Sequence, residues 1–234
     1  MDDTTIAERP PVPDLQMTRV QEANGVPHNS MHKPCTDIRL EGTTTFREDD
    51  AVQAAAALLD ALGVALDGEQ CQNTPRRMVL ALHEMLSAPR FEPTSFDNVD
   101  SYDEFVVVRA IPFASLCEHH VLPFIGTATI AYLPATRIVG LSKLARVVQM
   151  FSRRLQVQER LTTQIADWLV ETLAPHGVGV SLQAEHLCMT LRGVLAAGAL
   201  TTTTARRGVV AHEQARRREW DDLSASLVPS PRLL

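Results

Sequence analysis

Four side chains that can bind a metal or transfer a proton stand in a row, in the stretch SLCEHHVLPF: Cys117, Glu118, His119 and His120. In a regular strand Cys117 and His120 would point to opposite faces, so both can reach one ion only if the segment turns. Pro123 follows at a position that fits such an interruption. Cys-x-x-His is a plausible two-ligand clip for zinc, but a zinc site needs further ligands.

A third ligand is available in EHLCMTLRG. If an alternating strand runs through this stretch, one face carries His186, Cys188, Thr190 and Arg192. Cys188 would then complete a Cys, His, Cys set with an open fourth position, which is the coordination of a catalytic zinc. Such a zinc lowers the pKa of its water, and spare histidines beside it could carry protons. The alternative is that the cysteines are inert buried thiols, and spacing alone does not decide which histidine binds the metal.

The stretch GLSKLAR, residues 140–146, has the features of an anion site. Ser142 stands where a helix is expected to begin, and Lys143 and Arg146 fall on one face of that helix. A helix N-terminus with two cations suits phosphate. Arg192 and Arg77 could join this pocket, although a capped helix with solvated surface charges explains the same residues.

Gln158 and Glu159 stand at the start of another expected helix. An amide beside a carboxylate could read the donors and acceptors of a purine edge. The pair also suits the positive end of a helix dipole, and the residues alone favour this second interpretation.

The order of the surrounding elements predicts an α+β domain in which helices cover one face of an antiparallel sheet. Residues 1–44 are polar and rich in proline, which predicts a disordered extension. Residues 89–103 are expected to form a loop, and Thr74 is expected to cap the second helix. The predicted helices are 47–63, 74–89, 142–155, 158–173 and 212–223, and the predicted strands are 104–111, 124–133 and 178–194.

Composition narrows the class of protein. The chain has 234 residues and a net charge of −6, which argues against a general nucleic-acid surface. No apolar run is long enough to span a membrane, and the N-terminus has no signal core, so we expect a cytoplasmic protein. The four cysteines are widely spaced, which favours free thiols or metal ligands over disulfides.

Five stretches together resemble the GTP cyclohydrolase I family: TPRR, CEHH, GLSKLARVVQMFSRRLQVQERLT, HLCMTLRGV and TTTT, between about residues 45 and 224. The resemblance implies the tunnelling fold, a ββααββ antiparallel sheet with two helices on one face, over residues 104–224. A helical segment, 45–103, would precede it and a tail, 225–234, would follow. The resemblance also implies a homodecamer with active sites shared between subunits.

The resemblance implies a role for each candidate side chain. Zinc would be held by Cys117, His120 and Cys188, the proton-transferring histidines would be His119 and His186, and Ser142 would serve the rearrangement. The triphosphate would contact Lys143, Arg146, Arg192 and Arg77, and the guanine would contact Gln158 and Glu159, which reverses the preference from the residues alone. The implied reaction opens the imidazole ring of GTP by hydrolysis, releases C8 as formate and rearranges the ribose to give 7,8-dihydroneopterin triphosphate.

One segment departs from the family pattern. After the RGV turn, where many relatives carry basic residues, this chain has LAAGAL, with Leu195 and Leu200. The triphosphate contacts or the subunit contact could therefore differ.

Three alternatives stay open at this point: the same reaction in a 7-deazaguanine pathway, another tunnelling-fold enzyme such as a dihydroneopterin aldolase or nitrile reductase, and a non-catalytic zinc-bound member. The presence of His119, His186, Ser142 and Lys143 together favours an enzyme.

Overall fold

The computed structural model describes residues 45–225. The predicted disordered extension, 1–44, and all but the first residue of the predicted tail, 225–234, lie outside the described residues. Among the described helices, none has the length and apolar character needed to cross a membrane.

Two helices open the described part of the chain, as predicted: α1, Glu48–Ala61, and α2, Thr74–Met85. Three acids occupy the first turn of α1, and Gly63 takes a left-handed φ of 78° just after its end. The expected capping role of Thr74 is wrong, because Asn73 is the N-cap residue and Thr74 already belongs to α2. The two helices pack against each other, and Arg76 bonds Glu48 at 2.7 Å.

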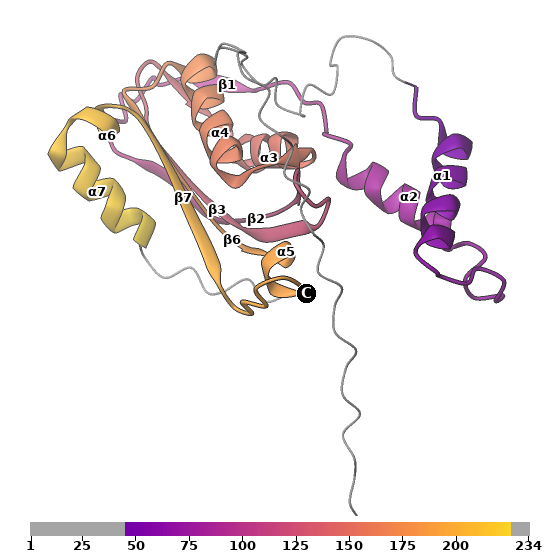
Figure 1. Cartoon of the computed structure of the whole chain (residues 1–234). Coiled ribbons are helices and arrows are strands. Elements are labelled where there is room, and N and C mark those ends of the chain that lie inside the picture. Colours follow the sequence, from indigo (N-terminus) through magenta and orange to yellow (C-terminus); the bar gives the residue numbers. More distant parts are fainter. Residues whose placement is uncertain (1–44, 226–234) are drawn as a thin grey trace, which may run out of the picture. The chain divides into compact units, whose positions relative to one another are not determined.

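A five-stranded sheet forms the centre of the fold (Figure 1). Its neighbours pair antiparallel, except that the short β5 runs parallel to β2. A second, two-stranded sheet includes part of the predicted loop 89–103. In the order of the large sheet the strands are β5 (Leu155–Gln156), β2 (Val106–Cys117), β3 (Pro123–Leu133), β6 (Gly177–His186) and β7 (Leu200–Gly208), and the small sheet pairs β1 (Ser95–Asp97) with β4 (Arg137–Val139).

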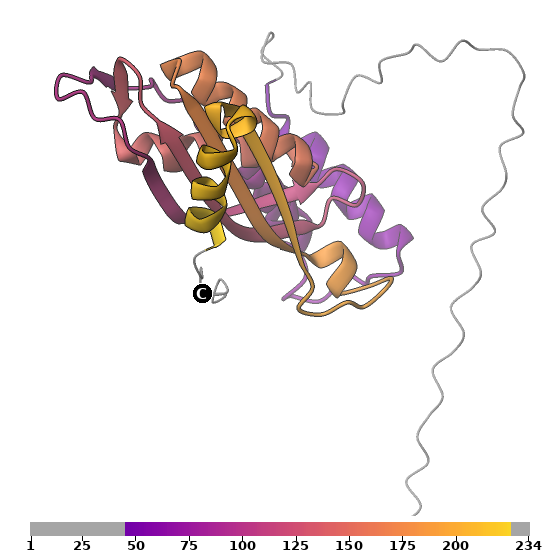
Figure 2. The ribbon, with the colours of Figure 1, turned by 90° about the vertical axis from the view of Figure 1, so that its left-hand side faces the viewer.

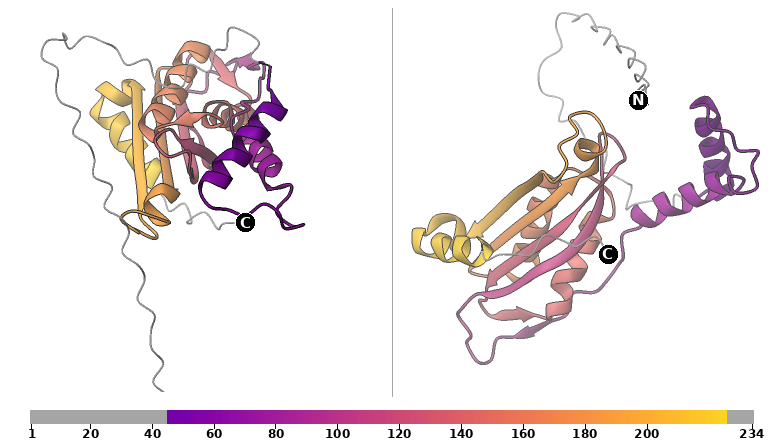
Figure 3. Two further views of the ribbon diagram at one scale, coloured as in Figure 1. Left: turned by 45° about the vertical axis from the view of Figure 1, so that its right-hand side comes forward. Right: turned by 90° about the horizontal axis from the view of Figure 1, so that it is seen from below.

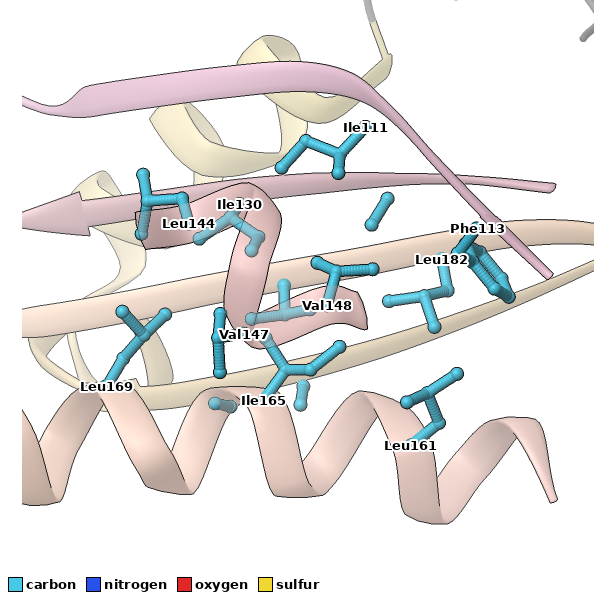
Figure 4. Packing of buried hydrophobic residues seen from close by; sticks show 14 of the residues in the cluster. Ile111, Phe113, Ile130, Leu144, Val147, Val148, Leu161, Ile165, Leu169 and Leu182 are labelled. Carbon is cyan, nitrogen blue, oxygen red and sulfur yellow. The ribbon is translucent and has the colours of Figure 1, made fainter. Parts of the chain in front are cut away.

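Two helices cover one face of the sheet: α3, Leu141–Ser152, and α4, Gln158–Leu173. Their apolar stripes meet the inward side chains of β2, β3 and β6 in one core (Figure 4). The labelled core residues are Ile111, Phe113, Ile130, Leu144, Val147, Val148, Leu161, Ile165, Leu169 and Leu182. The predicted α+β tunnelling fold is thereby confirmed, although Leu155, expected in a helix, lies in β5.

The opposite face of the sheet is partly covered by the C-terminal helices α6, Val209–His212, and α7, Gln214–Ala225 (Figures 2 and 3). Trp220 of α7 is fully buried there. A Cβ on Gly179 would come within 2.4 Å of the Trp220 ring, so the indole needs glycine at this position of β6. The charged helix itself was predicted, but this packing was not.

The strand predicted over residues 178–194 is wrong beyond its first half. β6 ends at His186, and the next four residues form a short helix, α5, Leu187–Thr190. The side chains of Cys188, Thr190 and Arg192 therefore do not share one strand face with His186.

Candidate metal centre

The turn between β2 and β3 brings Cys117 and His120 to the same side. Cys117 ends β2, and the backbone N–H of Val121 donates to its carbonyl oxygen at 2.8 Å. Val121 takes a left-handed φ of 55°, and the chain then enters β3. The Sγ atom of Cys117 lies 3.7 Å from Nδ1 of His120, so the predicted turn is present.

Cys188 reaches this turn through α5. The register pairs Phe124 at the start of β3 with His186 at the end of β6, which places the end of β6 beside the turn. The ligand atoms of Cys117, His120 and Cys188 all lie within 4.8 Å of one another. His119 also approaches Cys117, with Nδ1 at 3.7 Å from Sγ, but it does not belong to this three-residue group.

The spacing suits a small thiophilic cation. Zinc bonds of about 2.3 Å to sulfur and 2.0 Å to nitrogen, at a tetrahedral angle, separate the two ligand atoms by roughly 3.5 Å. The 3.7 Å between Cys117 Sγ and His120 Nδ1 is close to that separation. Two thiols and an imidazole are ligands that zinc favours, and three of them leave one position open.

Electrostatics favour a cation at the same point. Burial raises the pKa of the Cys188 thiol, and the nearby Cys117 sulfur raises it further, while Arg192 lowers it. Two thiolates that share a site repel each other, and a bound cation would remove that repulsion. Arg192 is thus within electrostatic reach of Cys188, even though it is not on the strand face where it was expected.

His186 is held firmly next to the metal group. Its ring stacks on Phe124 with centroids 4.7 Å apart and an interplanar angle of 1°. Its Nε2 lies 2.8 Å from Oε1 of Gln158. Burial lowers the pKa of His186, and the negative charge of Glu159 acts in the opposite direction.

Gln158 is oriented by the strands beneath it. Its side-chain nitrogen donates to the carbonyl oxygens of Leu182 and Thr201 and to Oγ1 of Thr203, at 3.0–3.2 Å. These contacts turn its oxygen toward His186, so Nε2 of that histidine is the donor and Nδ1 is left as the basic nitrogen. Gln158 is only 1% exposed, and the sequence pattern did not predict this role.

The predicted anion-binding residues are spread over three segments. Ser142, Lys143 and Arg146 lie in the first half of α3, Arg192 follows α5, and Arg77 is exposed on α2. Lys143 Nζ lies 5.9 Å from the centroid of the Phe91 ring. Between residues 45 and 225, no hydrogen bond or ion pair joins Arg77, Lys143 or Arg146 to the metal group, so their common pocket stays a prediction.

Fold and site together define an α+β protein with a three-ligand Cys–His–Cys group at one end of an antiparallel sheet, next to a fixed histidine. The model of the GTP cyclohydrolase I family matches residues 51–224, and the chain belongs to this family.

Two relatives named GTP cyclohydrolase 1 are similar to this chain over most of its length. The GTP cyclohydrolase 1 of Synechococcus sp. (strain JA-2-3B'a(2-13)) is 44% identical over 185 residues, which cover 76% of this chain and 80% of that protein. The GTP cyclohydrolase 1 of Aquifex aeolicus (strain VF5) is 46% identical over 168 residues, 72% of this chain and 91% of that protein. An apo archaeosine synthase QueF-Like structure covers 44% of this chain and 93% of its own, at 14% identity and a TM-score of 0.38, which is too low to support an argument.

Proposed function

We propose that this protein hydrolyses and rearranges GTP to 7,8-dihydroneopterin triphosphate and formate, the entry step of pterin synthesis, with zinc as its cofactor. Family membership supports the reaction. The observation that carries the proposal is the open Cys117, His120 and Cys188 group beside His186. An inert structural zinc site would normally have a fourth protein ligand.

Zinc would be held by the two cysteine sulfurs and Nδ1 of His120. In an open site of this kind the metal makes water nucleophilic near neutral pH. The Cys188 thiol, whose pKa burial and Cys117 raise, would bind as the thiolate when the cation is present.

His186 would move protons at the imidazole ring of guanine. Because Nε2–H of His186 donates a hydrogen bond to Oε1 of Gln158, Nδ1 is free to accept a proton and return it as the C8–nitrogen bonds break. The stack on Phe124 fixes the plane of the His186 ring, so Nδ1 keeps one orientation. His119, whose side chain is 63% exposed, would be the second proton carrier and faces the solvent side of the turn.

The remaining residues would bind and rearrange the substrate. Glu159 is exposed at the start of α4, next to His186, where its carboxylate could accept hydrogen bonds from a guanine edge. Gln158 would act mainly through His186, since its amide is already used. Ser142 would assist the ribose rearrangement, and the triphosphate would meet Lys143, Arg146, Arg192 and Arg77.

Arg77 lies on α2, and no contact within residues 45–225 joins it to the metal group. Its proposed role therefore fits a homo-oligomer, in the family a decamer, whose active sites take residues from more than one subunit. Location in the cytoplasm remains a prediction.

Removal and return of the metal tests the cofactor assignment. Dialysis against a chelator should abolish formate release from GTP, and one equivalent of zinc per subunit should restore it. Undiminished formate release by metal-free protein would refute the zinc-dependent reaction.

A further inference from the structure

Glu118 is the one member of the CEHH stretch without a place in the proposed reaction. Its backbone N–H donates to the carbonyl of Gln156 at 3.0 Å, where β5 runs beside β2. Its side chain is 18% exposed and forms an ion pair with Arg160 of α4, 42 residues away in sequence. Glu118 thus ties the metal-binding turn to α4.

Arg160 is itself fixed by a second partner. Its Nε donates at 2.9 Å to Oε1 of Gln156, which is fully buried. The amide nitrogen of Gln156 donates to the carbonyl of Phe151 at 2.9 Å and to Oε1 of Gln164 at 2.8 Å. Because both donors of this amide are used, its oxygen must face Arg160, and the guanidinium can hold Gln156 and Glu118 together.

The two ends of the turn differ in how firmly they are held. Cys117 is anchored by strand pairing and by its backbone N–H, which donates to Leu122 at 2.9 Å. The other end, His119 and His120, is exposed, and the backbone N–H of His120 makes only a 3.3 Å contact to the Cys117 carbonyl. The side chain of Glu118 is the fixed point next to this exposed end, and its second oxygen lies 3.9 Å from Nε2 of His119.

We propose that Arg160 is a positioning residue for the metal centre: by fixing Glu118 it sets the direction of His120 toward Cys117 and Cys188, and of His119 beside them. The proposal rests on the proposed zinc site. It assigns Arg160 no contact with substrate. Partners that orient metal ligands in this way typically account for about 10–100-fold in metal affinity or activity.

The test uses four variants of the full chain: Arg160→Gln, Glu118→Gln, the double variant, and Arg160→Lys, which keeps the charge but not the fork that reaches both partners. The matched control is Arg207→Gln. Arg207 of β7 forms an ion pair with Asp167, which lies on α4 as Arg160 does. Its Nε is 2.7 Å from Oδ1 of Asp167, and both side chains are partly exposed. Zinc affinity is measured by competition with a chromophoric chelator, and kcat and KM for GTP are measured at saturating zinc.

We expect Arg160→Gln and Glu118→Gln each to weaken zinc binding about 10–100-fold and to lower kcat, with KM for GTP changed less than about threefold. The double variant should match the worse single variant, since both changes break one connection. Arg160→Lys should recover part of the zinc affinity, and Arg207→Gln should match the unchanged protein.

Zinc affinity within twofold of the unchanged protein in both single variants would overturn the proposal. So would an equal loss in Arg207→Gln, which would indicate general destabilisation, or an additive loss in the double variant, which would make the two residues independent. The chelator competition needs no GTP turnover. An unchanged protein that binds zinc but releases no formate would therefore refute the proposed function and leave this proposal to be decided by zinc affinity.

Discussion

Replacement of Gln158 by methionine separates two roles for this residue, orientation of His186 and contact with guanine. Gln158→Met keeps the length and apolar volume of the side chain and removes its amide. The carbonyl oxygens of Leu182 and Thr201 lose a donor, while Thr203 keeps a partner in Thr162, whose Oγ1 lies 2.6 Å away.

Loss of these two hydrogen bonds, one buried and one partly buried, costs about 1–3 kcal/mol of unfolding free energy, at roughly 0.5–1.5 kcal/mol each. For a domain of this size that corresponds to a fall in Tm of about 2–12 °C. His186 loses the acceptor that fixes its tautomer, so kcat should fall at least about tenfold. The KM for GTP should change less than about threefold, because no substrate contact is removed.

Differential scanning fluorimetry and steady-state formate release measure the two effects. The control is Gln149→Met on α3, an exposed glutamine without a side-chain hydrogen bond within the described residues. Its unfolding free energy should stay within about 0.5 kcal/mol of the unchanged protein. A KM raised tenfold or more at unchanged kcat would refute the orientation role and assign Gln158 to guanine.

Three further substitutions test the site and the fold. Cys188→Ser should lose zinc and formate release together, because a hydroxyl is a poor zinc ligand, and full activity with bound metal would remove Cys188 from the ligand set. His119→Ala should keep zinc and lose turnover by about 100-fold or more, as expected for a proton carrier, and loss of metal instead would exchange the roles of His119 and His120. Trp220→Ala should cost about 3–5 kcal/mol, because the fully buried indole leaves a cavity over Gly179, and an unchanged Tm would show that α7 adds nothing to stability.

Helices with strong periodic patterns were well predicted from sequence. The expected helix 158–173 matches α4, because four apolar side chains repeat at helical spacing and an acid stands in its first turn. The strand expected over 104–111 is shorter than β2, which continues to Cys117 after an irregularity between Val108 and Ile111. Local β propensity did not reveal that the strand resumes beyond this point.

The helix at Leu187–Thr190 shows where alternation misleads. Apolar residues stand at even positions in β6 and, after the adjacent polar pair Glu185 and His186, at odd positions, so the alternation resumes in the opposite phase. A four-residue helix leaves no periodic signal of its own. Only the tertiary structure, in which the chain turns so that Cys188 lies near Cys117, distinguishes a short helix from a continued strand here. The three predicted ligands do come together in the structure, although the short helix that carries Cys188 was not predicted, and metal binding by this group stays a prediction.

The contacts that Gln158 and Arg160 make near the candidate site could not be predicted from the sequence. Gln158 reaches His186 across 28 positions and Arg160 reaches Glu118 across 42. No spacing within one helix or strand indicates such pairs, because their partners are set by how α4 packs on the sheet. A glutamine with low exposure at a helix start is the nearest signal, and it appears only once the fold is known.

The central claim is tested most directly by following formate and pterin together, with purified, zinc-replete protein and GTP. The proposed reaction predicts that formate and the fluorescent pterin obtained after oxidation appear in equal amounts and at equal rates. Formate without pterin would contradict the rearrangement steps assigned to Ser142, and neither product from zinc-loaded protein would contradict the proposed function as a whole.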